Sequence, residues 1–213
     1  MHRVPDKVPT LPADNGYEIL RTYFRQNYPE ILRKVSLQVR RSPRRQTGRF
    51  RTNRASRWKL DRAHPDYTDA AQIPLIEGKL LAMLLEFDDA PALNDQLRAA
   101  ALAVLGHEAQ PGNYRCPISG RHMNFRQILN EARKPTPGVS SFHVGHVRPK
   151  AKGGRNAADN TYWTTDLGNR IQGDKTWQES VQLIVEMAEF HRRKSGDVAW
   201  GELVNRYLER DPE

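Results

Sequence analysis

The stretch from Phe142 to Gly154, FHVGHVRPKAKGG, places two histidines just ahead of a basic loop with a double glycine. Imidazole titrates near neutral pH, so a histidine can take a proton from water, and its neutral ring can also bind a metal ion. In an extended strand, residues 143 and 145 share one face while residue 146 points to the other. The pair His143 and His146 alone therefore fits a catalytic base, a metal site or two ordinary polar residues.

The elements that must position these histidines are predicted to be short. FHVGHVRP and NTYWTT have the composition of strands, and a short helix over LGNRIQ is expected to follow, with Asp166 as its cap. Thr176 and Glu179 form a T-x-x-E capping box before an amphipathic helix, and a last helix is expected around residues 199–208.

This order of strand, loop, strand and short helix resembles the HNH, or ββα-metal, nuclease family. The residues that carry the resemblance are, in chain order, His146, Pro149, Gly153, Gly154, Asn160, Asn169, Gly173 and Asp174. Several matches in order at compatible spacings are a specific signal for a short motif. The resemblance covers residues 114–175 and says nothing about the first half of the chain.

The resemblance implies a role for each matching side chain. His146 would be the general base of phosphodiester hydrolysis, and Asn169 would be a ligand of Mg²⁺, Mn²⁺ or another divalent cation. Asn160 would be structural, tying down the loop and so orienting the histidine. Basic residues around this core would contact phosphates: Arg148, Lys150, Lys152, Arg155 and Arg170.

The sequence departs from the family at two places. Gly145 stands where a metal-binding side chain usually precedes the general base, so His143 would substitute, or Asn169 would act with phosphate and water, or Asp166 or Asp174 would reach in. Many relatives also have a zinc knuckle of two CxxC pairs. Here Cys116 is the only cysteine, and the other three knuckle positions are Ser119, Thr165 and Gly168, so we expect no structural zinc.

The charge of the chain favours a polyanionic partner. Lys and Arg number 34 against 25 Asp and Glu, a net charge of +9, and the excess is clustered between residues 33 and 62, where Asp61 is the only acid. We interpret this run as a nucleic-acid contact rather than a solvated face. The residues predicted to bind there are Arg40, Arg41, Arg44, Arg45, Arg49, Arg51, Arg54 and Arg57.

The first half of the chain is predicted to be helical. Apolar spacing and caps indicate helices after Asn15, from Pro29, over residues 74–87 and over residues 94–105, and another at 125–133. The pattern changes near residues 110–113. We therefore expect an α+β fold with two modules: a mostly helical, basic DNA-binding module at 1–112, and an HNH nuclease module with C-terminal helices at 113–213.

No run of apolar residues approaches the roughly 20 needed to span a bilayer, so a membrane protein is not expected. The polar N-terminus lacks the apolar core of a secretory signal, and a single cysteine agrees with a reducing compartment, so the expected location is the cytoplasm.

These observations predict a metal-dependent endonuclease that acts on double-stranded DNA, of the restriction type or from a phage or mobile element. Because one such site cuts one strand, a double-strand cut would require a homodimer, and the helices after Thr176 could form its interface. Two alternatives stay open: a nucleic-acid-binding protein with a decayed HNH core, and an RNA-directed factor, since a basic arm does not distinguish RNA from DNA.

Overall fold

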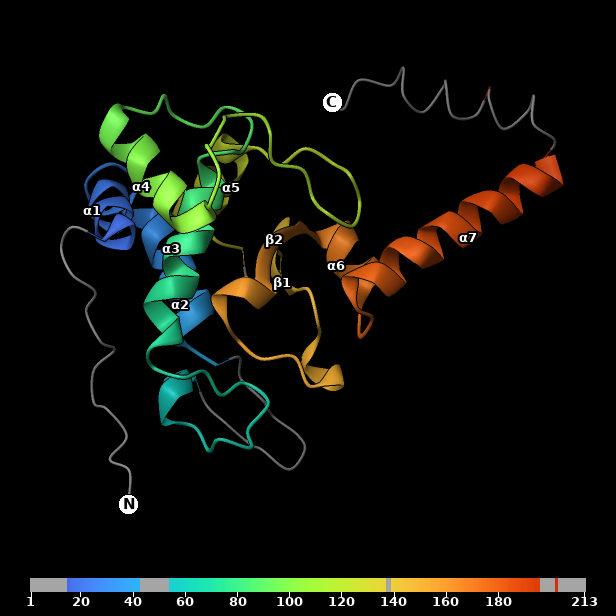
Figure 1. Cartoon of the computed structure of the whole chain (residues 1–213), viewed down its shortest axis with the longest axis horizontal. Coiled ribbons are helices and arrows are strands. Elements are labelled where there is room, and N and C mark those ends of the chain that lie inside the picture. The colour runs from blue at the N-terminus through green and yellow to red at the C-terminus, as the bar shows by residue number, and fades with distance from the viewer. Residues whose placement is uncertain (1–14, 43–53, 137–138, 196–201, 203–213) are drawn as a thin grey trace.

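The computed structural model describes residues 15–42, 54–136, 139–195 and 202. Helices precede a two-stranded sheet, and further helices follow it (Figure 1). The helices before the sheet are α1 (Gly16–Asn27), α2 (Pro29–Arg40), α3 (Gln72–Leu84), α4 (Asp95–Leu105) and α5 (Phe125–Arg133). The sheet and its flanking helices are β1 (Phe142–His146), β2 (Thr161–Thr165), α6 (Asp166–Gln172) and α7 (Trp177–Ser195). Short 3₁₀ turns lie at Arg57–Lys59 (η1), Lys150–Lys152 (η2) and Ala158–Asn160 (η3).

Local capping signals begin and end several of these helices. The Asn15 side chain accepts a hydrogen bond from the Tyr17 amide, and Pro29 is the first residue of α2. Gly106, at φ 80°, ends α4 in the left-handed conformation that glycine adopts without strain. Thr176 and Glu179 exchange the two bonds of a capping box, at 2.7 and 3.2 Å. These predicted caps are confirmed.

Two predicted boundaries were wrong. Helix α3 runs from Gln72 to Leu84 rather than over residues 74–87, because Pro74 fits within the first turn, where its missing N–H has no partner to lose. Helix α6 is capped by Thr165 and not by Asp166: the Thr165 hydroxyl accepts from the Gly168 amide at 3.1 Å. Strand β2 passes directly into α6, so the last strand residue takes the cap position. The helix expected around residues 199–208 lies outside the described residues, except for residue 202.

Strand β2 packs against α3 and is buried along most of its length. Its Trp163 is 0% exposed, and the Trp163 indole N–H donates to the Leu80 carbonyl of α3 at 2.9 Å. The Tyr114 hydroxyl exchanges hydrogen bonds with the Trp163 carbonyl and amide. The sheet is therefore anchored to the helical half of the chain and not only to its own neighbours.

A single cluster of buried side chains spans the boundary expected near residue 112. It contains Leu20 and Leu80 from the helical half, together with Phe142 and Trp163 from the sheet. The centroid of the Phe87 ring lies 6.0 Å from that of the Phe142 ring and 6.4 Å from that of the Trp163 ring. Because both halves contribute to this core, the stability of each is expected to depend on the other.

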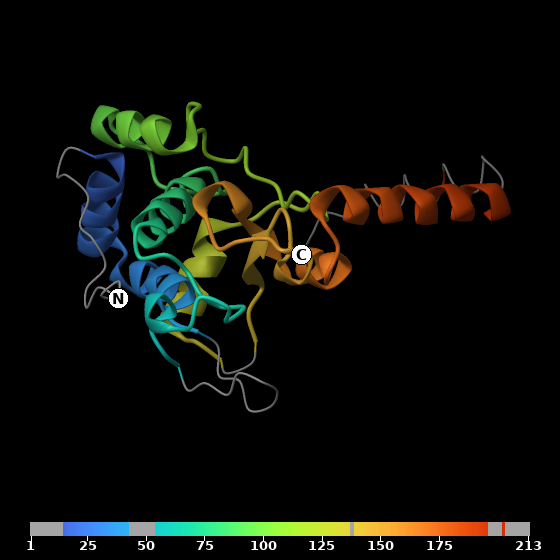
Figure 2. The same cartoon turned by 60° about the horizontal axis from the view of Figure 1, so that its bottom comes forward.

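Helix α7 extends away from the rest of the described chain in both views (Figures 1 and 2). It carries several exposed apolar side chains: Trp177, Val181, Val185, Met187 and Phe190. Neither α7 nor any other helix among the described residues is long and apolar enough to cross a membrane.

Candidate active site

His146 lies at the end of β1, where the two strands open into a loop. Strands β1 and β2 are antiparallel, with His146 opposite Thr161 and Phe142 opposite Thr165. Helix α6 follows β2 without a linker and contacts both strands. The structure thus has the order strand, loop, strand, helix that the sequence predicts for residues 142–172.

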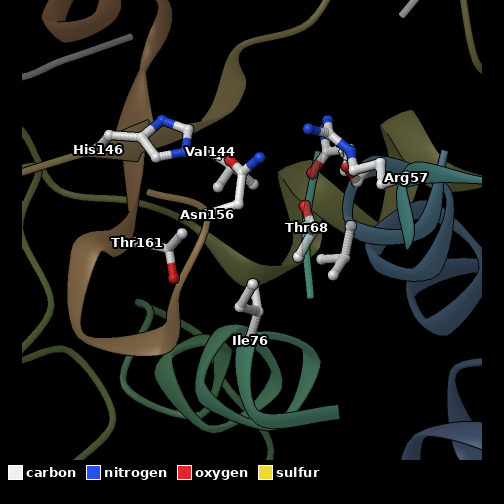
Figure 3. A pocket seen from close by; sticks show the side chains of 9 residues that line it. Arg57, Thr68, Ile76, Val144, His146, Asn156 and Thr161 are labelled. Atoms are coloured by element: carbon white, nitrogen blue, oxygen red, sulfur yellow. Dashed lines mark hydrogen bonds between the residues drawn. The ribbon is translucent and has the colours of Figure 1, made fainter. Parts of the chain in front are cut away.

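The His146 ring is held by one side chain of the loop. The His146 Nε2 atom lies 2.8 Å from the Asn156 side-chain oxygen, and the Asn156 amide nitrogen donates to the Tyr67 carbonyl at 3.0 Å. Figure 3 shows these two side chains on one wall of a small pocket of about 60 Å³, with Arg57 at its far side. Burial lowers the pKa of His146, and the cations Lys150 and Arg57 lower it further. The ring is therefore neutral at neutral pH, as a general base must be.

Asn160 ties the two ends of the loop together. Its side-chain oxygen accepts from the Arg148 amide at 2.8 Å, and its nitrogen donates to the Arg148 and Arg155 carbonyls at 3.0 and 2.7 Å. The Val147 amide also donates to the Asn160 carbonyl. These bonds fix the chain on both sides of the loop just after His146, which is the arrangement that an orienting asparagine would need.

A larger pocket of about 490 Å³ brings His146 and Asn169 together. Lys150 and Asp174 also line it. The oxygens of Asn169 and Asp174 are the kind of donor that Mg²⁺ and Mn²⁺ prefer, and such ions complete their shell with water and phosphate. No three His, Cys, Asp or Glu residues gather into a metal-binding group in the described part of the chain. Asn169 and Asp174 are therefore the oxygen donors in this pocket that could hold a divalent cation.

The tight packing of Tyr162 explains why Gly145 lacks a metal-binding side chain. A Cβ atom on Gly145 would stand 2.8 Å from Cζ of the buried Tyr162 ring, which lies across from it in the register of the sheet. The Tyr162 hydroxyl donates to the Gln172 side chain, whose nitrogen donates to the His146 carbonyl at 2.6 Å. The packing of Tyr162 on Gly145 and the bond from Gln172 thus support the strand end at His146.

We predict that Gly145→Ala lowers the free energy of unfolding by about 1–3 kcal/mol, because the added methyl group overpacks against Tyr162. Chemical denaturation measures this cost. In a Tyr162→Leu background the same substitution should cost less, since the ring is gone. Equal costs in both backgrounds would show that this contact does not determine the residue at position 145.

His143 lies on the other side of β1 and lines a third pocket, of about 290 Å³, that shares Asn169 and Val144 with the pocket of 490 Å³. The His143 Nε2 atom donates to the Ser140 carbonyl at 2.9 Å and is 3.5 Å from an Asp166 carboxylate oxygen. A ring nitrogen that donates to a carbonyl has no lone pair for a metal ion, so a ligand role would fall to Nδ1. The geometry favours Asp174 over His143 as the partner of Asn169.

The basic residues fall into three groups. Arg41, Arg54 and Arg57 line the third pocket beside His143 and Asn169, and Arg41 and Arg54 are exposed. Exposed Arg148, Lys152, Arg155 and Arg170 surround the loop and α6, where Lys152 pairs with Glu179 and Arg170 with Asp166. Arg44, Arg45, Arg49 and Arg51 lie outside the described residues.

Three of the predicted nucleic-acid contacts have strong partners within the protein. Arg40 donates two hydrogen bonds to the buried Glu77 carboxylate. Arg57 donates to the Arg41 and Gln38 carbonyls at the end of α2. Lys150 donates at 2.8 Å to Asp66, which is 2% exposed. These cations stabilise the framework of the site. Exposed Arg41 and Arg148 each donate one bond within the protein, to the Ser56 hydroxyl and the Lys152 carbonyl, and with Arg54 and Arg155 they are the candidates for phosphate contacts.

The four positions that correspond to a zinc knuckle converge in the structure. The Cys116 sulfur accepts from the Ser119 amide and the Thr165 hydroxyl at 3.4 and 3.5 Å. The Ser119 and Thr165 hydroxyls are 3.0 Å apart, and a Cβ on Gly168 would stand 2.6 Å from the Cys116 sulfur. Hydrogen bonds and close packing thus join these segments.

Two residues that hold His146 have no signal in the sequence pattern. Asn156 follows the double glycine as one polar residue among several, and Tyr67 contributes a backbone carbonyl that no side-chain pattern reports. Of the two carboxylates that the sequence offers as ligands, Asp174 lines the pocket of His146 and Asp166 does not.

No protein-family model matches this sequence, and no curated protein matches it. Among solved structures, the fold is similar to that of a chain described as a type II restriction endonuclease. The TM-score is 0.58 at 13% sequence identity, over 83% of this chain and 83% of that chain. At this identity the similarity shows the fold alone.

Proposed function

We propose that this protein is a metal-dependent DNA endonuclease of the ββα-metal type, with His146 as its general base. The observation that carries the proposal is the pocket in which a neutral His146 meets the oxygen donors Asn169 and Asp174. The fold shared with a type II restriction endonuclease supports a restriction-type enzyme acting on double-stranded DNA.

Each group has a task that its position allows. His146 takes a proton from the water that attacks phosphorus, Asn156 bonds to its ring, and Asn160 fixes the chain just after it. Asn169 and Asp174 would hold the divalent cation, which stabilises negative charge on the phosphoryl and leaving oxygens. Exposed arginines on either side, Arg41, Arg54, Arg148 and Arg155, would bind neighbouring phosphates. The products would carry 5′-phosphate and 3′-hydroxyl ends.

Incubation of supercoiled plasmid with the full-length protein and Mg²⁺ or Mn²⁺ tests this function. Nicked or linear product that disappears with EDTA is expected. Tight binding without cleavage across several DNA substrates would instead favour a decayed core, and selective cleavage of RNA would favour an RNA-directed factor.

The cation requirement gives a sharper prediction. Asp174→Asn should weaken Mn²⁺ binding, measured by electron paramagnetic resonance without DNA, by about 10-fold or more, because it removes a charged ligand. Asp166→Asn, on the His143 side of β1, is the matched substitution and should leave Mn²⁺ affinity unchanged. The reverse pattern would move the ion to the side of His143.

The pH dependence of cleavage follows from the burial of His146. Because its pKa lies below the usual 6.5, the base stays neutral as pH falls through the range in which an exposed histidine becomes charged. Cleavage should therefore persist at pH 6.5 and fall only at lower pH, as the lowered pKa is crossed. Single-turnover rates across pH at saturating metal measure this limb, and an acid limb centred above pH 7 would contradict the assignment.

A double-strand cut would also require two sites, and we propose a homodimer that uses α7. The exposed Trp177, Val181 and Val185 recur at a spacing of four on this helix. Light scattering should give a molar mass twice that of one chain. In Val181→Asp the molar mass should fall to that of a single chain. A single-chain mass for the wild-type protein at working concentration would end this proposal.

A further inference from the structure

We propose that Asn156 is a positioning residue that fixes both the orientation and the tautomer of the His146 ring, and that the helical half of the chain takes part through the Tyr67 carbonyl. This inference rests on the proposed role of His146 as base. It assigns a task to a residue that the sequence motif leaves unexplained, and it connects the catalytic loop to a segment far away in the chain.

The direction of the hydrogen bonds carries the argument. A carbonyl oxygen only accepts, so the bond of 3.0 Å between Asn156 and Tyr67 requires the amide nitrogen of Asn156 to face Tyr67. The side-chain oxygen of Asn156 then faces His146 at 2.8 Å and must accept from Nε2. His146 is therefore protonated at Nε2, and its Nδ1 retains the lone pair that a base needs.

The loop that carries Asn156 is itself held from the helical half. The Lys79 ammonium group of α3 donates to the Ala158 carbonyl at 2.7 Å, and the Ala158 amide donates to the Gln72 side chain. Together with Asn160 on the other side, these bonds limit the movement of Asn156. Tyr67 lies just before α3, so this helix and its approach segment hold both the loop that carries Asn156 and the Tyr67 carbonyl that Asn156 contacts.

A neutral amide suits a base that must stay uncharged. The charged groups that act on His146 are Lys150 of η2, Arg57 of η1 and Asp66 before α3. The first two disfavour the imidazolium form, whereas Asp66 favours it. The hydrogen bond to Asn156 raises the pKa of His146 but does not outweigh its burial, which lowers it. A carboxylate in place of the Asn156 amide would favour the imidazolium more strongly and retain the proton.

Nitrogen-15 NMR of the full-length, metal-free protein tests the tautomer directly, because protonated and unprotonated ring nitrogens have well-separated shifts. The wild-type spectrum should show His146 protonated at Nε2. In Asn156→Leu the two tautomers should mix, and the single-turnover cleavage rate should fall by about 10–100-fold with little change in the Kd for DNA. Asn113→Leu, at an exposed asparagine, is the matched control and should change neither the His146 tautomer nor the cleavage rate.

Asn156→Asp keeps the acceptor and separates positioning from folding. It should retain the Nε2–H tautomer and move the acid limb of cleavage to higher pH. If Asn156→Leu fails to fold, the spectra of the wild-type and Asn156→Asp proteins still show which nitrogen of His146 is protonated. A wild-type ring protonated at Nδ1, or an Asn156→Leu protein with an unchanged tautomer and rate, would overturn the inference. Absent cleavage with the expected spectra would refute the proposed function alone.

Discussion

His146→Ala is expected to reduce DNA cleavage by about 10²–10⁴-fold, because no other neutral imidazole faces the pocket of Asn169 and Asp174 among the residues that line it. Binding of DNA should change little, since the phosphate contacts proposed above come from exposed arginines and not from His146. Plasmid cleavage under single-turnover conditions and a binding titration in Ca²⁺ measure the two effects separately.

A matched control is available at His107, which lies on the loop after α4 and pairs with Glu86 at 2.9 Å. His107→Ala should leave cleavage within a few-fold of wild type. If His146→Ala cleaves at the wild-type rate, His146 is not the base. If both histidine variants lose activity together, the loss reflects folding and not chemistry, and circular dichroism would show it.

Trp163→Ala is expected to lower the free energy of unfolding by about 3–5 kcal/mol, the usual cost of removing a fully buried tryptophan. Its ring packs on Phe87 and its N–H bonds to α3, so the change should destabilise the helical half as well as the sheet. Denaturation followed by circular dichroism and by tryptophan fluorescence should show one shared transition, shifted by the same amount.

Leu102→Ala is the control, because Leu102 is 46% exposed on α4. Its cost should be well under that of Trp163→Ala. Two separate transitions in the wild-type protein would contradict the shared core and would instead support modules divided near residue 112. Expression of residues 113–213 alone is expected to give an unfolded product, since Phe142 and Trp163 would lose their partners in α3 and after it.

Most helices could be predicted from the sequence because their signals are local. Asn15, Pro29, Gly106 and the Thr176–Glu179 pair act within a few residues of their own helix, and their caps form as expected. The order of strand, loop, strand and helix was likewise visible in the spacing of a few residues. Helix boundaries such as the start of α6 could not be predicted to the residue, because Thr165 and Asp166 are both polar residues that can cap a helix.

The contacts that complete the site could not be predicted, because they join segments far apart in the chain. Arg40, a predicted DNA contact, donates to the buried Glu77 carboxylate of α3 and so joins α2 to α3. The fit of Tyr162 against Gly145 turns an apparent loss of a ligand into a packing requirement. The hydrogen bond from Asn156 to Tyr67 is accepted by a backbone carbonyl, and a pattern of side chains gives no information about such a group.

A crystal structure with Mn²⁺ and a duplex oligonucleotide tests the central claim most directly. We predict an anomalous peak for Mn²⁺ at about 2.0–2.2 Å from an Asn169 oxygen, with the scissile phosphate in the same pocket and His146 Nδ1 facing a water in line with it. A peak between His143 and Asp166, or a phosphate bound away from His146, would contradict the account.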